Sequence, residues 1–237
     1  MTRGTNVDAR DRLIVALDVE TLPAALELAG RVEGTARWVK VGLELFIAEG
    51  PHAVRELRRK GFGVMLDLKL CDIPETVARA TARAADLGAQ LLTVHVGGGR
   101  RMMESAAEAA RKAGSGLGIL GVTVLTSLDD RDLAEIGVQG DVGQVVVRRA
   151  RLAMESGLFG VVASPKEAAS IRAAAPDGFL IVTPGVRPEG SDVGDQKRVS
   201  TPRGARAQGA DFVVVGRPIR DATDPRKAAE AIIAELA

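Results

Sequence analysis

The chain has 237 residues, of which 46% are hydrophobic and 27% charged, and its formal net charge is +1. These values are ordinary for a globular domain, and they provide no basic field of the kind that attracts nucleic acid. Aromatic residues are only 3%, with no tyrosine, which argues against a surface that stacks bases. The single cysteine, Cys71, excludes an intrachain disulfide and a cysteine-cluster zinc site.

The N-terminal segment is polar and has no apolar core of the kind found in signal peptides. No apolar run approaches the length of a membrane span. We therefore expect a cytoplasmic protein. Residues 1–11 are predicted to form a flexible arm, and residues 12–237 a single domain.

From residue 12 onward, short runs rich in Val, Ile and Leu alternate with Ala-rich helical patterns. The strands are predicted at Leu13–Leu17, Trp38–Val41, Gly63–Leu68, Leu91–Val94, Gly118–Leu125, Gly160–Val162, Leu180–Val182 and Phe212–Val215. The helices are predicted at Leu22–Arg31, Leu43–Lys60, Glu75–Leu87, Arg101–Ala113, Gly143–Ser156, Lys166–Ala174, Thr201–Gln208 and Asp224–Leu236. Apolar strands that alternate with helices indicate a parallel sheet covered by helices. Eight such units predict a single-domain (β/α)8 TIM barrel, with a doubly wound open sheet as the alternative.

The segment 183–199 is the one long stretch without a predicted element. Loops of this length in compact domains are usually functional or disordered.

Polar side chains follow the apolar runs at the ends of the predicted strands. They are Asp18, Lys40, Asp67, Lys69, His95, Thr126, Ser127, Ser164, Thr183 and Arg217. In a (β/α)8 barrel the active site is built at the C-terminal ends of the strands. The recurrence of polar residues at this rim therefore predicts an enzyme.

The stretch from Asp67 to Thr76 carries the densest chemistry. Asp67 and Lys69 are two residues apart at a strand end, so their side chains should point to the same side. A structural ion pair is the alternative interpretation. Most of the 32 basic residues are arginine, yet Lys40 and Lys69 lie in apolar strand contexts. Lysine can exchange a proton near neutral pH once its pKa is shifted, and arginine cannot. We therefore predict that Lys69 and Lys40 are catalytic, within a matched network of Lys40, Asp67, Lys69 and Asp72.

Gly216 and Arg217 follow the last predicted strand. Barrels often bind phosphate at the loops after strands seven and eight, where backbone N–H groups face the anion. Arg217 would add a charge-assisted contact, although a surface arginine is the alternative.

Four other features favour structural roles. The G-x-G-x-x-G pattern at 116–121 precedes a strand instead of opening a helix, which argues against a dinucleotide site. The glycines at 97–99 favour a tight turn over an anion nest. For His95 a place in the pocket wall or core is favoured over a role as a base. Cys71 has no neighbouring base in the sequence.

Several of these segments resemble one known family. The segments are Asp67-x-Lys69-x-x-Asp72-Ile73-Pro74-x-Thr76, Leu-Thr126-Ser127, Thr183-Pro-Gly-Val-Arg187-Pro, Gly194-Asp-Gln196 and Val215-Gly216-Arg217-Pro. In this order they closely resemble the orotidine 5′-phosphate decarboxylase family, from Asp18 to Pro218. The resemblance implies decarboxylation of orotidine 5′-phosphate to UMP in pyrimidine nucleotide synthesis, without metal or organic cofactor.

The same resemblance implies a role for each matching residue. Lys69 would protonate C6 as carbon dioxide leaves, and Asp67 would lie near the substrate carboxylate and keep Lys69 charged. The expected substrate contacts are Asp18 and Lys40 at the ribose, Thr126 and Ser127 at the pyrimidine, and Arg187, Gln196, Gly216 and Arg217 at the phosphate end. The segment 183–199 would close over the phosphate. Asp72, Ile73 and Thr76 would enter the site of a neighbouring subunit, which makes the enzyme a homodimer with shared sites.

Two rivals remain. One is a metal-dependent barrel acting on a sugar phosphate, such as a ketogulonate-phosphate decarboxylase or a hexulose-phosphate synthase. The other is a catalytically silent barrel that only binds nucleotides. The presence of both Lys69 and Asp67 argues against the silent barrel, because a pure binder has no use for a matched proton donor.

Overall fold

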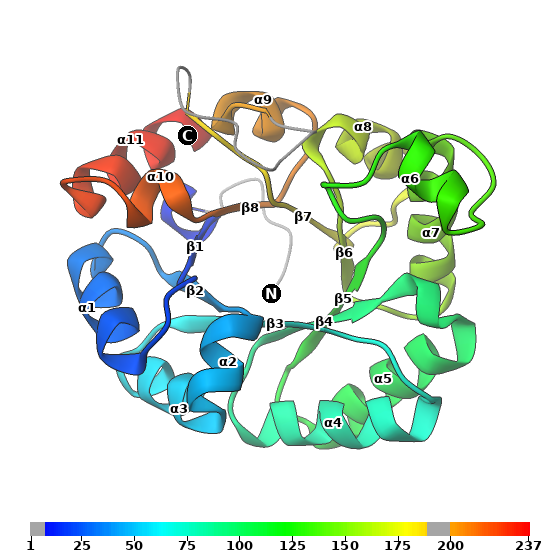
Figure 1. Cartoon of the computed structure of the whole chain (residues 1–237), viewed down its shortest axis with the longest axis horizontal. Coiled ribbons are helices and arrows are strands. Elements are labelled where there is room, and N and C mark those ends of the chain that lie inside the picture. Colours follow the sequence, from blue (N-terminus) through cyan, green and yellow to red (C-terminus); the bar gives the residue numbers. More distant parts are fainter. Residues whose placement is uncertain (1–7, 189–199) are drawn as a thin grey trace.

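The computed structural model describes residues 8–188 and 200–237, and it forms a closed ring of parallel strands surrounded by helices (Figure 1). Each strand pairs with the next along the chain, and β8 pairs with β1. The strands are β1 Leu13–Ala16, β2 Trp38–Val41, β3 Gly63–Leu70, β4 Leu91–His95, β5 Gly118–Val122, β6 Gly160–Val162, β7 Leu180–Thr183 and β8 Phe212–Val215. The predicted barrel is confirmed, and the open sheet is wrong.

The helices cover the outside of the ring. They are α1 Leu22–Val32, α2 Leu43–Glu49, α3 Pro51–Arg59, α4 Pro74–Asp86, α5 Arg100–Ala113, α6 Asp130–Glu135, α7 Val142–Glu155, α8 Pro165–Ala174, α9 Pro202–Ala207, α10 Arg217–Arg220 and α11 Pro225–Leu236. Two 3-10 turns, η1 Ala9–Asp11 and η2 Val96–Gly98, complete the described elements. Many helices begin with a proline after a Ser, Thr or Asp cap, as at Ser164-Pro165 and Thr201-Pro202.

The alternation along each strand separates two cores. Residues facing outward, such as Leu92 and Val94, pack against the helices. Those facing inward fill the barrel, where the rings of Trp38 and Phe212 meet edge to face at 5.7 Å. This interior is apolar in its lower part, and the side chains two residues further along β2, β3 and β4 are polar. The apolar layer therefore lies directly beneath a polar layer at the C-terminal ends of the strands.

One expected helix, Leu43–Lys60, is wrong as a single element. The structure ends α2 at Glu49 and begins α3 at Pro51, with Gly50 between them at φ 59°. A glycine with positive φ ends a helix readily, and a proline at the first helical position opens the next. The Gly-Pro pair was the signal in the sequence.

The region after β5 differs from expectation as well. The strand predicted at Gly118–Leu125 ends at Val122, because its neighbour β6 has only three residues with which to pair. The chain then forms a loop and the unpredicted helix α6, which begins with a capping box between Asp129 and Asp132. The short helix α10 after β8 was not predicted either.

Part of the predicted arm lies in η1. Asp8 caps this turn, and Arg37 forms an ion pair with Asp11 at 3.1 Å. Residues 1–7, and the part of the 183–199 loop from residue 189 onward, lie outside the described residues. The flexible arm therefore stays a prediction.

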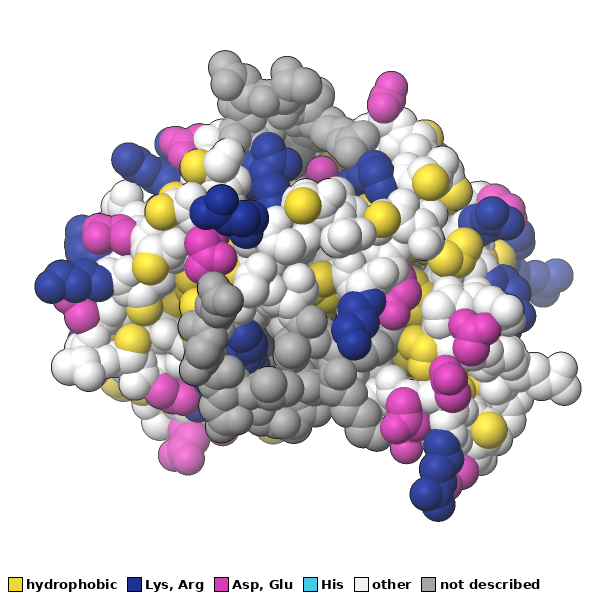
Figure 2. Space-filling model, turned by 90° about the horizontal axis from the view of Figure 1, so that it is seen from above, with side chains coloured by type: hydrophobic (Ala, Val, Ile, Leu, Met, Phe, Trp, Pro, Cys, Tyr) yellow, Lys and Arg dark blue, Asp and Glu magenta, His cyan; other side chains and the backbone are white. Residues whose placement is uncertain are grey.

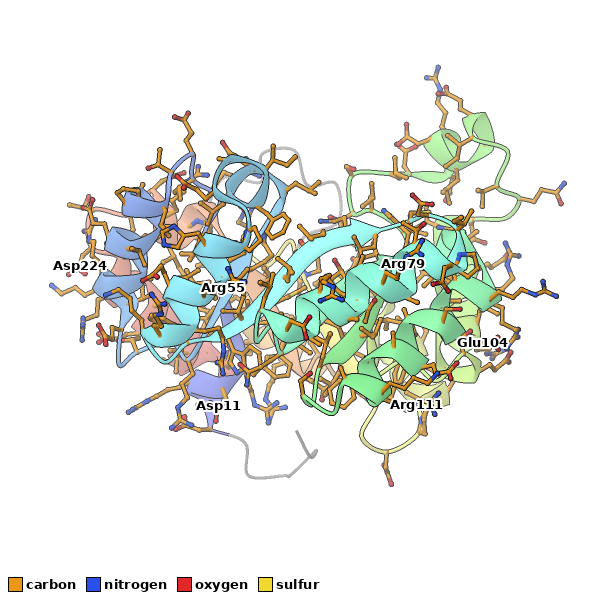
Figure 3. All side chains as sticks on the ribbon, turned by 90° about the horizontal axis from the view of Figure 1, so that it is seen from below. Asp11, Arg55, Arg79, Glu104, Arg111 and Asp224 are labelled. Carbon is orange, nitrogen blue, oxygen red and sulfur yellow. The ribbon has the colours of Figure 1, made fainter. Side chains whose placement is uncertain are left out.

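The surface mixes charges of both signs. On the face shown in Figure 2, basic and acidic side chains are interspersed over much of the described surface. Figure 3 shows the same mixture on the helices, with Arg79 on α4 and Glu104 and Arg111 on α5 pointing outward. Within residues 8–188 and 200–237, no helix is both long and apolar enough to cross a membrane.

Candidate active site

A cavity of about 450 Å³ opens at the C-terminal ends of the strands. Its wall includes residues from seven of the eight strands or from the loops that follow them. The polar residues among them are Asp18, Lys40, Asp67, Lys69, Thr126, Ser127, Arg187, Arg217 and Arg220. This volume suits a small-molecule ligand, and the position is the usual one for the active site of a barrel. Most of the residues predicted for the site are therefore brought together.

Four of these residues form a continuous chain of opposite charges. Asp18 Oδ1 lies 2.7 Å from Lys40 Nζ, which lies 3.8 Å from Asp67 Oδ2. The same oxygen of Asp67 lies 2.9 Å from Lys69 Nζ. Lys40 and Asp67 are nearly buried, whereas the Lys69 side chain is 30% exposed and can reach a ligand. The predicted side-by-side placement of Asp67 and Lys69 is confirmed.

Burial and pairing act against each other on Asp67. Burial alone would raise the pKa of its carboxyl group. The nearby charges of Lys40 and Lys69, with hydrogen bonds from Lys69 and Thr93, outweigh burial and hold the pKa of Asp67 below its ordinary value. Asp67 is therefore a fixed anion in contact with Lys69.

Thr93 is a part of the site that the sequence reasoning missed. It follows Leu91 on the inward face of β4 and is completely buried. Its hydroxyl donates a hydrogen bond to Asp67 Oδ1 at 2.9 Å and accepts one from the backbone N–H of Lys69 at 2.9 Å. A polar residue at an inward position of an otherwise apolar strand was the available signal.

The wall beside Asp18 is formed by the loop after β8. A Cβ atom on Gly216 would lie 3.5 Å from Asp18 Oδ2, so the backbone of Gly216 runs close to the ion network. Arg217 and Arg187 line the same cavity, and Arg187 is 9% exposed. Arg187 and Arg217 give a favourable environment for an anion, whereas the guanidinium of Arg220 is already paired with Asp221 at 2.6 Å.

Arg220 was not predicted. Its Nη1 donates a hydrogen bond to the backbone carbonyl of Asp18 at 2.9 Å, which ties α10 to the end of β1. The helix α10 that carries Arg220 was not predicted, so the direction of this side chain could not be predicted from the sequence either.

The loop after β5 supplies a different part of the wall. Thr126 and Ser127 line the cavity together with Val124 and Leu125. Because β5 ends early, at Val122, these residues lie on a loop and not on a strand. Gln196 falls outside the described residues, and so do Gly194 and Asp195.

Asp72, Ile73 and Thr76 do not line the cavity of their own chain as the structure describes it. Asp72 is exposed, and its Oδ1 accepts the backbone N–H of Ile73 at 2.6 Å. Ile73 is 67% exposed. Within one chain as the structure describes it, Asp72 does not join Lys40, Asp67 and Lys69, and Asp18 is the fourth member of that chain of charges. A place for Asp72 in the network of a neighbouring subunit stays a prediction.

The glycines that favoured structural roles lie in a strand and in a helix cap. Gly118 and Gly121 lie inside β5, and Gly99, at φ 90°, caps α5 in a tight turn. Burial lowers the pKa of His95, and the charges of Lys69 and Arg149 lower it further against the opposing effect of Asp67. His95 is thus a neutral, half-buried side chain near neutral pH. Cys71 is exposed.

Among the described residues, no group of three or more His, Cys, Asp or Glu side chains could hold a metal ion.

Comparison with known proteins agrees with this geometry. Residues 11–232 match the model of the family described as orotidine 5′-phosphate decarboxylase / HUMPS. The chain belongs to this family. It is 50% identical to an orotidine 5′-phosphate decarboxylase of Moorella thermoacetica, over 96% of this chain and 93% of the relative. It is 53% identical to the enzyme of that name from Anaeromyxobacter sp. (strain K), over 95% of this chain and 98% of the relative.

Solved structures show the same likeness. The crystal structure of orotidine 5′-phosphate decarboxylase from Lactobacillus acidophilus has a TM-score of 0.84 and is 35% identical, covering 95% of this chain and 99% of that chain. The one from Pyrococcus horikoshii OT3 has a TM-score of 0.77 at 28% identity, covering 94% and 98%. Membership in this family identifies the chain as an enzyme, a carboxy-lyase.

Proposed function

We propose that this enzyme decarboxylates orotidine 5′-phosphate to UMP and carbon dioxide, in the pyrimidine nucleotide synthesis of the cytoplasm. The observation that carries the proposal is the buried, ionised Asp67 in contact with the partly exposed ammonium of Lys69. The names of relatives that are about 50% identical over nearly the whole chain support it.

In the proposed reaction, the bond between C6 and the carboxylate breaks and carbon dioxide leaves. The electron pair remains on C6 and takes a proton from Lys69 Nζ, which later regains a proton from water. The ammonium stabilises the negative charge as it develops, and this electrostatic effect would be strong once a bound substrate excludes water from the pair. Asp67 keeps Lys69 protonated until that moment, and a fixed anion beside the substrate carboxylate would add repulsion that is relieved when carbon dioxide leaves.

The remaining contacts fit one nucleotide laid across the cavity. Asp18 and Lys40 would bind the ribose hydroxyls, because they are the network members on the side of Gly216. Thr126 and Ser127 would face the pyrimidine. Arg187, Gln196, Gly216 and Arg217 would hold the phosphate, and the loop at 183–199 would close over it. Binding energy gained at the phosphate would then be used at C6.

The decisive experiment measures the loss of orotidine 5′-phosphate absorbance with the purified protein, with and without EDTA. We expect turnover that EDTA leaves unchanged. Absence of turnover would refute the proposal and favour the metal-dependent sugar-phosphate enzymes, and loss of turnover in EDTA would contradict a reaction without metal.

The protein is further proposed to be a homodimer in which Asp72, Ile73 and Thr76 complete the partner's site. The exposure of Ile73, at 67%, leaves its side chain accessible to a partner chain and so supports this arrangement. Mixing inactive Asp72→Asn and Lys69→Ala subunits should restore activity, since one site of each hybrid dimer is then intact. If each chain supplied its own site alone, mixing would restore none.

A further inference from the structure

Strand β3 leaves its regular pairing where the two charged residues of the site lie. Leu66 pairs with Leu92 of β4, and the next paired residue of β3 is Leu70, opposite Val94. Three residues of β3, 67–69, therefore oppose the single residue Thr93. Such a bulge bends a strand and re-aims its side chains.

The backbone of Lys69 is strained at this bulge. Among the residues that the structure describes, Lys69 is the one non-glycine residue with a positive φ, 51°. The left-handed conformation is unfavourable for a residue with a side chain, so it persists only where surrounding contacts hold it. A regular strand would place Lys69 in the ladder, where its N–H would meet a backbone carbonyl.

One hydroxyl takes the place of that ladder contact. Thr93 Oγ1 accepts the N–H of Lys69 at 2.9 Å, and its own proton goes to Asp67 Oδ1 at 2.9 Å. The hydroxyl thereby fixes both the backbone of Lys69 and one carboxylate oxygen of Asp67. With Oδ1 held, Oδ2 is the oxygen that faces Lys69 Nζ at 2.9 Å and Lys40 Nζ at 3.8 Å.

We propose that Thr93 is a positioning residue that sets the geometry of Asp67 and Lys69 through this single hydroxyl. Thr93 is completely buried, so a bound substrate would not touch it. Its effect must therefore pass through the two residues that it holds. The proposal rests on the proposed function, because its kinetic test uses orotidine 5′-phosphate.

Thr93→Val removes the hydroxyl and keeps the shape of the side chain. The N–H of Lys69 then loses its acceptor, and Asp67 loses the contact that orients it. We expect kcat to fall roughly 10- to 100-fold, as is typical when an outer contact of a reacting group is lost. KM should stay within about twofold, because the phosphate and ribose contacts are intact. Thr93→Ser restores the hydroxyl and should recover most of the lost kcat.

The matched control is Thr81→Val in α4. Thr81 is also completely buried, and its hydroxyl has no hydrogen-bond partner among the described residues. This variant removes a buried hydroxyl from a helix away from the network, so kcat and KM should equal those of the wild type. Thermal unfolding of all three variants verifies that the chains are folded.

Crystal structures of the wild type and of Thr93→Val provide a readout that needs no turnover. We expect Asp67 to turn and the distance from Asp67 Oδ2 to Lys69 Nζ to lengthen in the variant. An unchanged kcat in an active enzyme, a failure of Thr93→Ser to restore it, or an unmoved Asp67–Lys69 pair would overturn the proposal. A wild type without turnover would refute the proposed function instead, and the two crystal structures would still decide the role of Thr93.

Discussion

Among the described residues, two ion networks each contain a nearly buried pair, and they differ in what completes them. At the C-terminal ends of the strands, Asp18, Lys40, Asp67 and Lys69 satisfy one another through their side chains. At the opposite end of the barrel, Arg172 of α8 pairs with Asp211, which precedes β8. The paired side chains of Lys40 and Asp67 are 10% and 12% exposed, and those of Arg172 and Asp211 are 16% and 12%. Burial alone does not separate the two networks.

The partners do separate them. Arg172 donates to the backbone carbonyls of Phe179 and Gly209, and Asp211 accepts the backbone N–H of Ile181. This pair therefore links α8 to the backbone before and within β7 and to the backbone before β8. The rim network faces a cavity, and Lys69 uses its side chain for Asp67 and for whatever enters. A charged group whose remaining capacity faces a cavity is available for chemistry, whereas one held by backbone groups serves stability.

The most severe test of this comparison removes Lys69, the partly exposed cation of the network at the C-terminal ends of the strands. Lys69→Met should lower kcat at least about 10³-fold, because the proton donor and the charge that stabilises the transition state are both lost. Asp67 keeps Lys40 as a partner at 3.8 Å, so the chain should remain folded. Steady-state kinetics with a circular dichroism spectrum checks both statements. A folded variant with nearly full activity would contradict the assignment of Lys69.

Removing Arg172, the cation of the pair at the opposite end of the barrel, should lower stability and leave activity unchanged. Arg172→Met leaves Asp211 buried without its partner, and breaking such a pair by removing one member costs roughly 3–5 kcal/mol of unfolding free energy. Because the pair lies at the far end of the barrel, kcat per folded molecule should be unchanged. Urea unfolding and kinetics at low temperature measure the two effects. A loss of kcat with intact stability would mean that the two networks do not divide these roles.

These two networks also show how far the sequence can lead. The alternation of apolar strands and helices predicted the barrel, and the barrel placed Asp67, Lys69 and Arg217 on one rim, because parallel strands end at a common edge. The contact between Lys40 and Asp18 needed the register between β1 and β2, which strand patterns do not contain. The role of Thr93 was not predicted, because it depends on the bulge in β3. That bulge is a tertiary feature, and no glycine in the sequence marks its position. The predicted entry of Asp72 into a neighbouring subunit's site came from the family resemblance, because spacing along one chain does not show which site a loop reaches.

A smaller change sharpens the description of the rim. A Cβ atom on Gly42 would lie 2.8 Å from Lys40 Nζ and 3.1 Å from Asp18 Oδ1, so Gly42 leaves room for their ion pair. Gly42→Ala should displace Lys40 and lower kcat/KM about tenfold, as misplacement of a positioned group does. Gly30→Ala is the matched control, because a Cβ atom there meets nothing within 4 Å. Equal kcat/KM in both variants would show that the ion pair tolerates the added atom.

The smallest expected effect concerns how acid weakens the rim. The pKa of Asp67 is below its ordinary value in the folded chain, so the unfolded chain binds a proton first as the pH falls. The stability contributed by the ionised carboxylate is therefore fully present above the ordinary pKa of aspartate, about 3.9, and is lost as the pH falls through the lowered pKa. Urea unfolding of the wild type and of Asp67→Asn should show a difference in unfolding free energy that shrinks in acid.

Asp221→Asn is the control: hydrogen bonding to Arg220 also lowers the pKa of Asp221, but its side chain is 54% exposed. Solvent screens that pair, so its removal should change the acid dependence less. An equal change in both variants would mean that burial among Lys40, Lys69 and Thr93 adds nothing to the stability of the Asp67 carboxylate.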